Sequence, residues 1–219
     1  MEKKPKIREY QGNGVTIKYD VKRCIHAEEC IHALPDVFSQ HQRPWVQPGE
    51  TPTEELVNAV LGCPTGALQF ERTDGGENER PPVKNRAWFV KDGPIYVHGN
   101  LELIDPEGNI LHKDTRMALC RCGDSKNKPF CDNTHLETGF EADGVGTIKE
   151  STEQQAEDDV LRIMVRPNKS LRFMGNFELF NGRGELLYSG CRVGLCRCGA
   201  SKKKPFCDSM HNEIGWTSE

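Results

Sequence analysis

The chain has 219 residues, of which 29 are Lys or Arg and 33 are Asp or Glu, so its formal net charge is −4. This length fits one large domain or two modest ones, and 21 Gly, 13 Pro and a mean hydropathy of −0.66 indicate small, loop-rich cores. Bound metal would then supply part of the folding free energy. The mild negative charge excludes a strong nucleic-acid footprint, although short basic segments occur at 126–128 and 202–204.

No run of eighteen or more apolar residues occurs, and the charged residues 1–5 lack the apolar core of a secretory signal. We therefore expect a soluble, cytoplasmic protein without a membrane partner. The ten cysteines lie in Cys-x-Cys and Cys-Pro settings with interleaved histidines. This spacing is typical of metal ligands rather than of disulfides.

The first 75 residues contain the signals of a small α+β unit. Apolar and polar residues alternate over 15–19, which predicts a strand that leads to Cys24. Residues 54–61 have helical apolar spacing, and we expect Thr53 to cap this helix and Gly62 to end it. A second short strand is predicted at 67–71.

Three cysteines in this region, Cys24, Cys30 and Cys63, stand in a pattern that resembles the divergent mono-cluster ferredoxin family. The resemblance also includes Trp45 and the sequence Cys-Pro-Thr-Gly-Ala over 63–67. Bacterial ferredoxins have a third cysteine midway between the first two, where this chain has Ala27, which carries no donor atom. Three thiolates fit a 3Fe-4S cluster most simply, whereas a 4Fe-4S cluster needs another ligand, for which His26 and His32 are candidates.

Residues 76–86 are polar and rich in Gly, Glu, Arg and Pro, which predicts a linker. Beyond it the sequence repeats without gaps at an offset of 76 residues, from Gly99 against Gly175 onward. We expect one repeat over 87–142 and another over 160–219, joined by an acidic linker at 143–159. Strands are predicted at 87–90, 95–97, 161–165 and 171–173, with hairpin turns at Gly108 and Gly184.

Each repeat carries three cysteines and a histidine at identical spacing, namely Cys120, Cys122, Cys131 and His135, then Cys196, Cys198, Cys207 and His211. Residues two apart in an extended segment point the same way, so each Cys-x-Cys forms one donor pair. If a helix follows Phe130 with Asp132 as its capping acceptor, Cys131 and His135 form a second pair. Two pairs suit a two-iron, two-sulfide cluster, but one zinc ion also accepts three Cys and one His.

This motif closely resembles the CDGSH iron-sulfur family at every ligand position. The Gly-Ser for which the family is named is replaced by Asn133-Thr134 in one copy and by Ser209-Met210 in the other. The resemblance implies a redox-active, acid-labile 2Fe-2S cluster in each repeat, held by three Cys and one His. It also implies a small, metal-stabilised α+β fold in which both repeats pack as an intramolecular pseudo-twofold pair with a small β-sheet cap, and hence a monomer.

Several other residues have simpler interpretations. Asp132 and Asp208 fit helix caps better than proton donors. Lys128 and Lys204 are either solvated or placed beside a cluster. Cys191 matches no motif and is expected to be a buried structural thiol. The remaining histidines and the tryptophans are expected to be surface, strand or packing residues, namely His41, His98, His112, Trp45, Trp88 and Trp216.

The leading functional hypothesis is an electron carrier with two 2Fe-2S clusters, a third 3Fe-4S or 4Fe-4S cluster and a redox partner protein. A second hypothesis is a labile cluster donor, or a redox or pH sensor, that serves an apo-acceptor protein. A zinc-bound interaction module is a third. An enzyme is disfavoured because the sequence contains no nucleophile and base pairing, phosphate loop or surplus carboxylate pair near the ligands.

Overall fold

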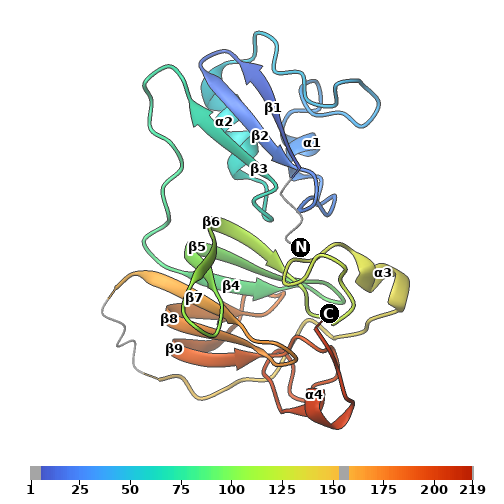
Figure 1. Ribbon diagram of the computed structural model, residues 1–219. Helices are drawn as coiled ribbons and strands as arrows, with labels where there is room; N and C mark the ends of the chain where they lie inside the picture. Colours follow the sequence, from blue (N-terminus) through green and yellow to red (C-terminus); the bar gives the residue numbers. More distant parts are fainter. Residues whose placement is uncertain (1–5, 153–157, 219) are drawn as a thin grey trace. The chain divides into compact units, whose positions relative to one another are not determined.

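The computed structural model describes residues 6–152 and 158–218. The chain divides into two compact units, Met1–Arg80 and Pro81–Glu219 (Figure 1). The boundary lies within the segment 76–86 that was expected to be a linker. Each unit has its own apolar core.

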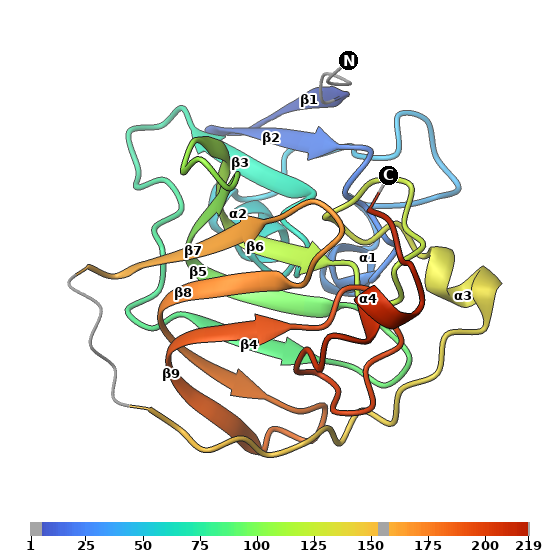
Figure 2. The same cartoon turned by 60° about the horizontal axis from the view of Figure 1, so that its bottom comes forward.

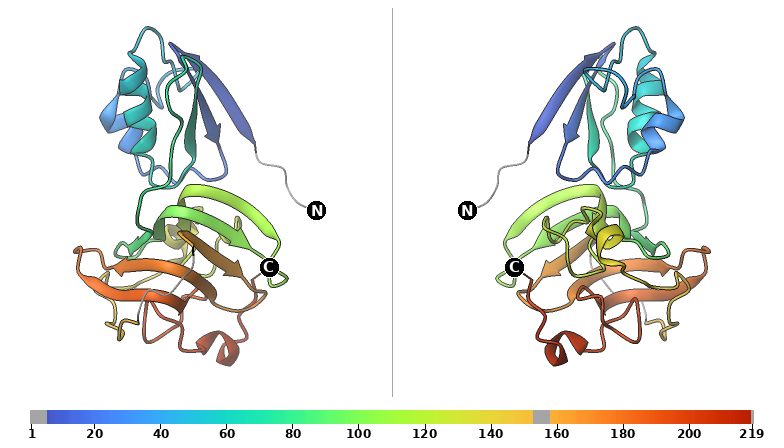
Figure 3. Two further views of the ribbon diagram at one scale, coloured as in Figure 1. Left: turned by 90° about the vertical axis from the view of Figure 1, so that its left-hand side faces the viewer. Right: turned by 90° about the vertical axis from the view of Figure 1, so that its right-hand side faces the viewer.

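The N-terminal unit is a three-stranded antiparallel sheet covered on one face by two helices (Figure 3). Its elements in chain order are β1 (Ile7–Gly12), β2 (Val15–Asp20), α1 (Glu29–Ala33), α2 (Thr53–Leu61) and β3 (Leu68–Arg72). The strand order is β1-β2-β3, with Ile17 opposite both Tyr10 and Phe70. Fully buried Val15, Ile17 and Leu56 close the core because alternate residues of β2 and one face of α2 meet there.

The predicted strands at 15–19 and 67–71 and the helix ending at Gly62 are confirmed to within one residue. The predicted helix cap is wrong. Thr53 is the first helical residue and Pro52 precedes it as the N-cap, with no side-chain capping bond. The Thr53 hydroxyl instead donates to the Asn13 carbonyl oxygen at 2.6 Å, so it ties α2 to the turn between β1 and β2.

The C-terminal unit is a six-stranded sheet with two short helices at its loops (Figure 2). The sheet contains β4 (Arg86–Phe89), β5 (Ile95–Ile104), β6 (Ile110–Leu119), β7 (Val160–Val165), β8 (Leu171–Phe180) and β9 (Leu186–Leu195). The helices are α3 (Thr134–Thr138) and α4 (Met210–Glu213). The turns at Gly108 and Gly184 have positive φ values of 90° and 80°, which favour glycine in both hairpins.

Two long hairpins, β5-β6 and β8-β9, are joined by the short strands β4 and β7. The strand β4 is antiparallel to β5 and parallel to β8, whereas β7 is antiparallel to β8 and parallel to β5. Each repeat therefore lends its first strand to the hairpin of the other. Matching ion pairs accompany this exchange, because Arg86 Nε lies 3.4 Å from Glu178 Oε2 and Arg162 Nε lies 3.4 Å from Glu102 Oε2.

Asn85 forms hydrogen bonds to both repeats at the place where they exchange strands. Its side-chain amide donates to the carbonyl oxygens of Asp159 and Asn176 at 2.9 Å each, and its Oδ1 accepts from the Asn100 backbone at 2.8 Å. The side chain fills the space beside Gly99, where a Cβ would overlap it. This explains the glycine at the β-bulge of β5.

The four strands predicted in this unit are present, although β5 and β8 extend to ten residues each. The hairpin partners β6 and β9 and the strand β1 were not predicted. Within the described ranges, no helix combines the length and the apolar character that crossing a bilayer requires.

Candidate metal centre

The first motif brings its four predicted donors together as two pairs. Cys120 follows directly after β6, and its Sγ lies 3.6 Å from Cys122 Sγ. Cys131 Sγ lies 3.5 Å from His135 Nδ1. All four side chains are at most 8% exposed. The sulfur and nitrogen atoms thus lie in two pairs, and the histidine Nδ1 is the nitrogen that faces the cysteine sulfur.

The second motif has the same arrangement at the end of β9. Cys196 Sγ and Cys198 Sγ are 3.8 Å apart, and Cys207 Sγ lies 3.5 Å from His211 Nδ1. The two sites differ in exposure, because Cys131 is buried whereas Cys207 is half-buried. Across the described part of the chain, no set of three or more His, Cys, Asp or Glu side chains converges as a site for a single metal ion.

An aspartate directly after the third cysteine organises each metal-binding loop. Asp132 Oδ1 accepts from the Thr134 backbone at 3.1 Å, and Asp132 Oδ2 accepts from the Lys126 backbone at 2.8 Å. Asp208 accepts from Met210 and Lys202 at 3.2 and 2.8 Å. Both aspartates accept backbone N–H groups as expected, but the prediction that they are the helix caps is wrong, because the N-caps are Asn133 and Ser209.

The helix in each motif begins later than the spacing argument required. The helix α3 starts at Thr134, and its N-cap is Asn133 rather than Asp132. Cys131 consequently lies before the helix and not on it. A left-handed residue, Asn133 with φ 71° or Ser209 with φ 74°, turns the chain so that the histidine still faces the cysteine.

Backbone N–H groups point at the sulfur atoms of both motifs. Cys120 Sγ accepts from Gly123 at 3.4 Å, Cys122 Sγ from Asp124 at 3.5 Å and Cys131 Sγ from Asn133 at 3.5 Å. In the second motif, the Ser209 N–H donates to Cys207 Sγ at 3.4 Å. Such bonds stabilise thiolates, which are the form that binds metal.

The pKa values show how closely the thiols interact. The hydrogen bond between the two side chains of each Cys-x-Cys lowers the pKa of one of them. Cys122 lowers the pKa of Cys120 to about 6, and Cys196 lowers the pKa of Cys198 to about 6. Burial raises the pKa of Cys131 to about 11. Burial, together with the positive charge of Arg121, lowers the pKa of His135, which favours the neutral imidazole that a metal requires.

The donor set fits a metal cluster on chemical grounds. Each site offers three cysteine thiols, one histidine imidazole and backbone N–H donation to sulfur. Arg121 is 1% exposed, and its Nη1 atom has no hydrogen-bond partner among the described residues. A buried guanidinium beside thiolates supplies positive charge where a cluster would add negative charge.

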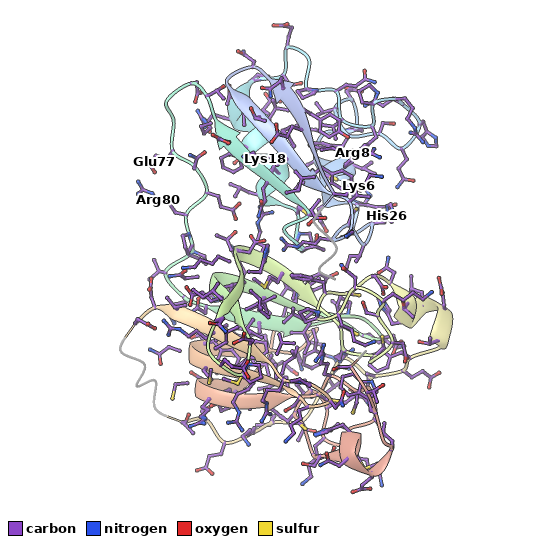
Figure 4. All side chains as sticks on the ribbon, in the orientation of Figure 1. Lys6, Arg8, Lys18, His26, Glu77 and Arg80 are labelled. Atoms are coloured by element: carbon purple, nitrogen blue, oxygen red, sulfur yellow. The ribbon has the colours of Figure 1, made fainter. Side chains whose placement is uncertain are left out.

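The N-terminal cysteines line a third candidate site. A cavity of about 530 Å³ is lined by Cys24, Cys30 and Cys63 together with His26 and Ala27. Burial and the neighbouring Cys63 and Cys24 raise the pKa of Cys30 to about 12. His26 is exposed in the loop between β2 and α1 (Figure 4) and has a left-handed backbone with φ 53°.

The two candidate histidines for this third site differ in position. His26 lines the cavity, whereas His32, which is also exposed, is not among the residues that line it. Trp45 contributes to the cavity wall and packs against Tyr19 with ring centroids 4.7 Å apart. The cavity therefore unites the three predicted cysteines with one of the two histidines.

Comparison with protein families identifies the domains in which the three candidate sites lie. Residues 92–136 and 168–212 match the family described as iron-binding zinc finger, CDGSH type, and residues 10–73 match the divergent 4Fe-4S mono-cluster family. The chain contains two CDGSH-type domains and one divergent mono-cluster domain. Both predicted resemblances are confirmed, and together these domains support iron–sulfur binding.

Two curated relatives are similar to only part of this chain. Both are described as uncharacterized protein YjdI, one from Escherichia coli K12 and one from Escherichia coli O157:H7. Each is 27% identical over 61 residues, which is 28% of this chain and 80% of the relative. No solved structure gives a significant match.

The other residues predicted near the CDGSH-type domains have mixed outcomes. The hydrogen bond with Cys122 lowers the pKa of Cys120 most, and the positive charge of Lys128 lowers it further by a smaller amount. Lys204 donates to the Ser201 carbonyl oxygen at 2.9 Å. Cys191 was expected to be buried, but it is half-buried in β9, so that prediction is wrong. All ten cysteines are among the described residues, and none of them forms a disulfide.

The tryptophans and the remaining histidines lie in ordinary packing or surface positions, apart from Trp216. Trp88 stacks on Tyr96 with ring centroids 5.5 Å apart. His112 lies 3.3 Å from Asp114. The Arg197 guanidinium carbon lies over the Trp216 ring, 5.5 Å from the ring centroid. The sequence did not predict this contact. The sequence did carry one indication that Arg197 matters, because an arginine stands between the paired cysteines of both motifs, as Arg121 and Arg197.

Proposed function

We propose that this chain is an electron carrier with a 2Fe-2S cluster in each CDGSH-type domain and a third cluster in the N-terminal unit. The main support is the arrangement of donors in pairs, with Cys120 beside Cys122 and Cys131 beside His135. A 2Fe-2S cluster takes two protein ligands on each iron, whereas a single zinc ion takes four ligands around one point.

When bound, such a cluster accepts and releases single electrons. The chain contributes three thiolates and one imidazole, which together carry one less negative charge than four thiolates, and its N–H donors to sulfur stabilise negative charge. Both features favour the addition of an electron. Two-histidine Rieske sites begin near about −150 mV and all-cysteine plant-type sites lie near about −400 mV. We expect these sites to have potentials between those values or slightly above them.

We also propose that the two repeats form a pseudo-twofold pair and that the protein acts as a monomer. The reciprocal exchange of β4 and β7, with the matching Arg86–Glu178 and Arg162–Glu102 pairs, supports this arrangement. A two-repeat chain supplies internally both halves of an interface that single-repeat chains would form as dimers. The ten described cysteines form no disulfide, which supports a reducing compartment such as the cytoplasm.

For the third cluster, we propose Cys24, Cys30 and Cys63 as ligands. Three thiolates complete a 3Fe-4S cluster, and the position of His26 at the cavity supports it as the fourth ligand of a 4Fe-4S form. The family description of residues 10–73 favours the four-iron form. Electron paramagnetic resonance of anaerobically purified protein distinguishes the two forms. The His26→Ala variant should convert the 4Fe-4S form into the 3Fe-4S form.

The electron-carrier proposal is tested by redox titration monitored in the visible spectrum. We expect reversible one-electron reduction at each CDGSH-type site, and we expect His135→Cys and His211→Cys to lower the potential of the altered site. A thiolate adds negative charge where the imidazole had none, which disfavours a further electron. Irreversible bleaching during every reductive titration would contradict the proposal.

A second candidate function is donation of clusters to an apo-acceptor protein. The half-buried Cys207 supports it, because the second site presents a ligand nearer to solvent than the buried Cys131 of the first site. Transfer is measured as the gain of absorbance by an apo-ferredoxin mixed with the oxidised protein. A rate no greater than that with free iron and sulfide would exclude this candidate.

A further inference from the structure

The Cys-x-Cys loops of the two CDGSH-type domains are in direct backbone contact. A Cβ on Gly123 would lie 2.9 Å from the Cys198 carbonyl oxygen, and a Cβ on Gly199 would overlap the Cys122 carbonyl oxygen. Each contact joins the glycine of one motif to a proposed ligand of the other. Because glycine lacks a side chain, it permits an approach that no other residue would.

Trp216 strengthens this contact from the second repeat. Its Nε1–H donates to the Gly123 carbonyl oxygen at 3.2 Å, and the same ring lies 5.5 Å from the Arg197 guanidinium. The tryptophan thus links the loop of the first site to the arginine of the second. The cation–π contact and the hydrogen bond together connect Arg197 of the second motif, through Trp216, to the Cys-x-Cys loop of the first.

Arg121 and Arg197 are charged side chains buried in this contact region. They are 1% and 3% exposed. Arg121 donates to the carbonyl oxygens of Val90 and Gly93 at 2.7 and 2.8 Å, and Arg197 donates to that of Arg166 at 3.4 Å. Among the residues that the structure describes, Arg121 Nη1 and Arg197 Nε have no hydrogen-bond partner.

A buried guanidinium stays charged and needs negative charge nearby. Burial lowers the pKa of Arg197, and attraction to Cys120 of the opposite motif opposes this effect. Burial lowers the pKa of Arg121 to about 10, and this effect is opposed most by Asp92 of its own repeat and next by Cys196 of the opposite motif. Geometry places both arginines at the contact of the two Cys-x-Cys loops, because each is the residue between the paired cysteines and the neighbouring glycines touch the opposite loop.

We propose that Arg197 is an electrostatic partner of the first metal site and that Arg121 is the reciprocal partner of the second, so that the two sites form one coupled redox unit. The inference rests on the proposed cluster binding at both sites. Positive charge held near a cluster in a poorly solvated environment favours its reduced state. Loss of either arginine should therefore act mainly across the repeat boundary.

Arg197 provides the sharper test, because the positive charge of Arg121 also lowers the pKa of His135 in its own site, after burial. The experiment uses the full chain carrying His135→Cys, so that the first site has four thiolates and differs spectroscopically from the His-ligated second site. Dithionite supplies one electron to each site, and no covalent bond forms or breaks. Arg197→Gln should lower the midpoint potential of the first site more than that of the second.

Two further variants separate charge from packing. Arg197→Lys retains the positive charge and should restore most of the potential lost in Arg197→Gln. Arg121→Gln should lower the potential of the second site, which provides the reciprocal control. If Arg197→Gln shifts only the second site or neither site, the proposal is overturned. Loss of both clusters from the Gln and Lys variants alike would assign Arg197 to folding and would also overturn it.

Iron and acid-labile sulfide are measured first in the unaltered chain. If they are absent, the proposed cluster binding fails and the coupling fails with it. If they are present and the potentials of the Arg197 variants match that of their parent, only the coupling is refuted. The two failures are thus distinguished by analyses of the same preparations.

Discussion

Asn133 and Ser209 occupy the same backbone position in the two motifs, one residue after the organising aspartate, and both are left-handed, with φ values of 71° and 74°. Asparagine tolerates this conformation better than serine does. The glycine for which the CDGSH family is named stands at this position. Replacing it preserves the fold of the loop but leaves conformational strain in the second motif.

Ser209→Gly should therefore stabilise the protein. Removing the left-handed strain is worth roughly 1–2 kcal/mol, and the greater freedom of glycine in the unfolded chain cancels part of it. We expect a net gain of about 0.5–1 kcal/mol, measured by thermal or denaturant unfolding. Asn133→Gly is the matched control and should change stability less. Destabilisation by Ser209→Gly would contradict the explanation.

Gly199→Ala should be among the most damaging small substitutions. It combines a positive φ of 78° with overlap of the Cys122 backbone. Gly184→Ala isolates the first effect, because Gly184 has φ 80° and its Cβ would meet no atom within 4 Å. We expect a loss of about 1 kcal/mol for Gly184→Ala and a further 1–3 kcal/mol for Gly199→Ala. If both variants lose the same free energy of unfolding, the backbones of the two loops are not in tight contact.

Acid should release the cluster of the first site. The pKa of His135 is lowered from its usual value of 6.5, mainly by burial. A lowered histidine pKa means that the neutral form contributes stability above pH 6.5, and that this stability is lost as the pH falls through 6.5 toward the folded-state value. Visible absorbance should accordingly decline below about pH 6.5.

The His135→Cys variant tests this assignment. A thiolate ligand should slow the acid bleaching of the first site, because its loss no longer follows imidazole protonation. His41→Gln is a suitable control, since His41 is exposed and belongs to the other unit. Bleaching rates that are identical in all three proteins would show that His135 is not a ligand.

The N-terminal cavity offers a gain-of-ligand experiment. Ala27 lines the cavity midway between Cys24 and Cys30, where bacterial ferredoxins carry a cysteine. Ala27→Cys should yield a 4Fe-4S cluster with four thiolates, identified by the electron paramagnetic resonance of the reduced protein. Ala33→Cys, which adds a thiol at the end of α1, is the control and should leave the signal unchanged.

The donor residues were predictable from the sequence because the same spacing occurs twice. Identical intervals from Cys120 to His135 and from Cys196 to His211 predicted the pairs, and both pairs are present. The start of α3 was predicted too early, since helical spacing alone does not reveal the left-handed turn at Asn133.

Contacts between repeats were harder to predict. The exchange of β4 and β7 depends on pairing between residues as distant as Arg86 and Glu178, and apolar alternation specifies a strand but not its neighbour. Arg121 and Arg197 are the matching residues of the two motifs, yet nothing in a local pattern indicates that the two Cys-x-Cys loops touch each other. Thr53 was expected to cap α2 because cap statistics ignore the Asn13 carbonyl oxygen that it reaches.

Metal analysis tests the central claim most directly. In the full chain with Cys24, Cys30 and Cys63 replaced by Ser, only the two CDGSH-type sites retain their proposed ligands. The paired donors predict iron and acid-labile sulfide in equal amounts in anaerobically purified protein, with two irons for each motif. Zinc bound at one ion for each motif, without labile sulfide, would contradict the account.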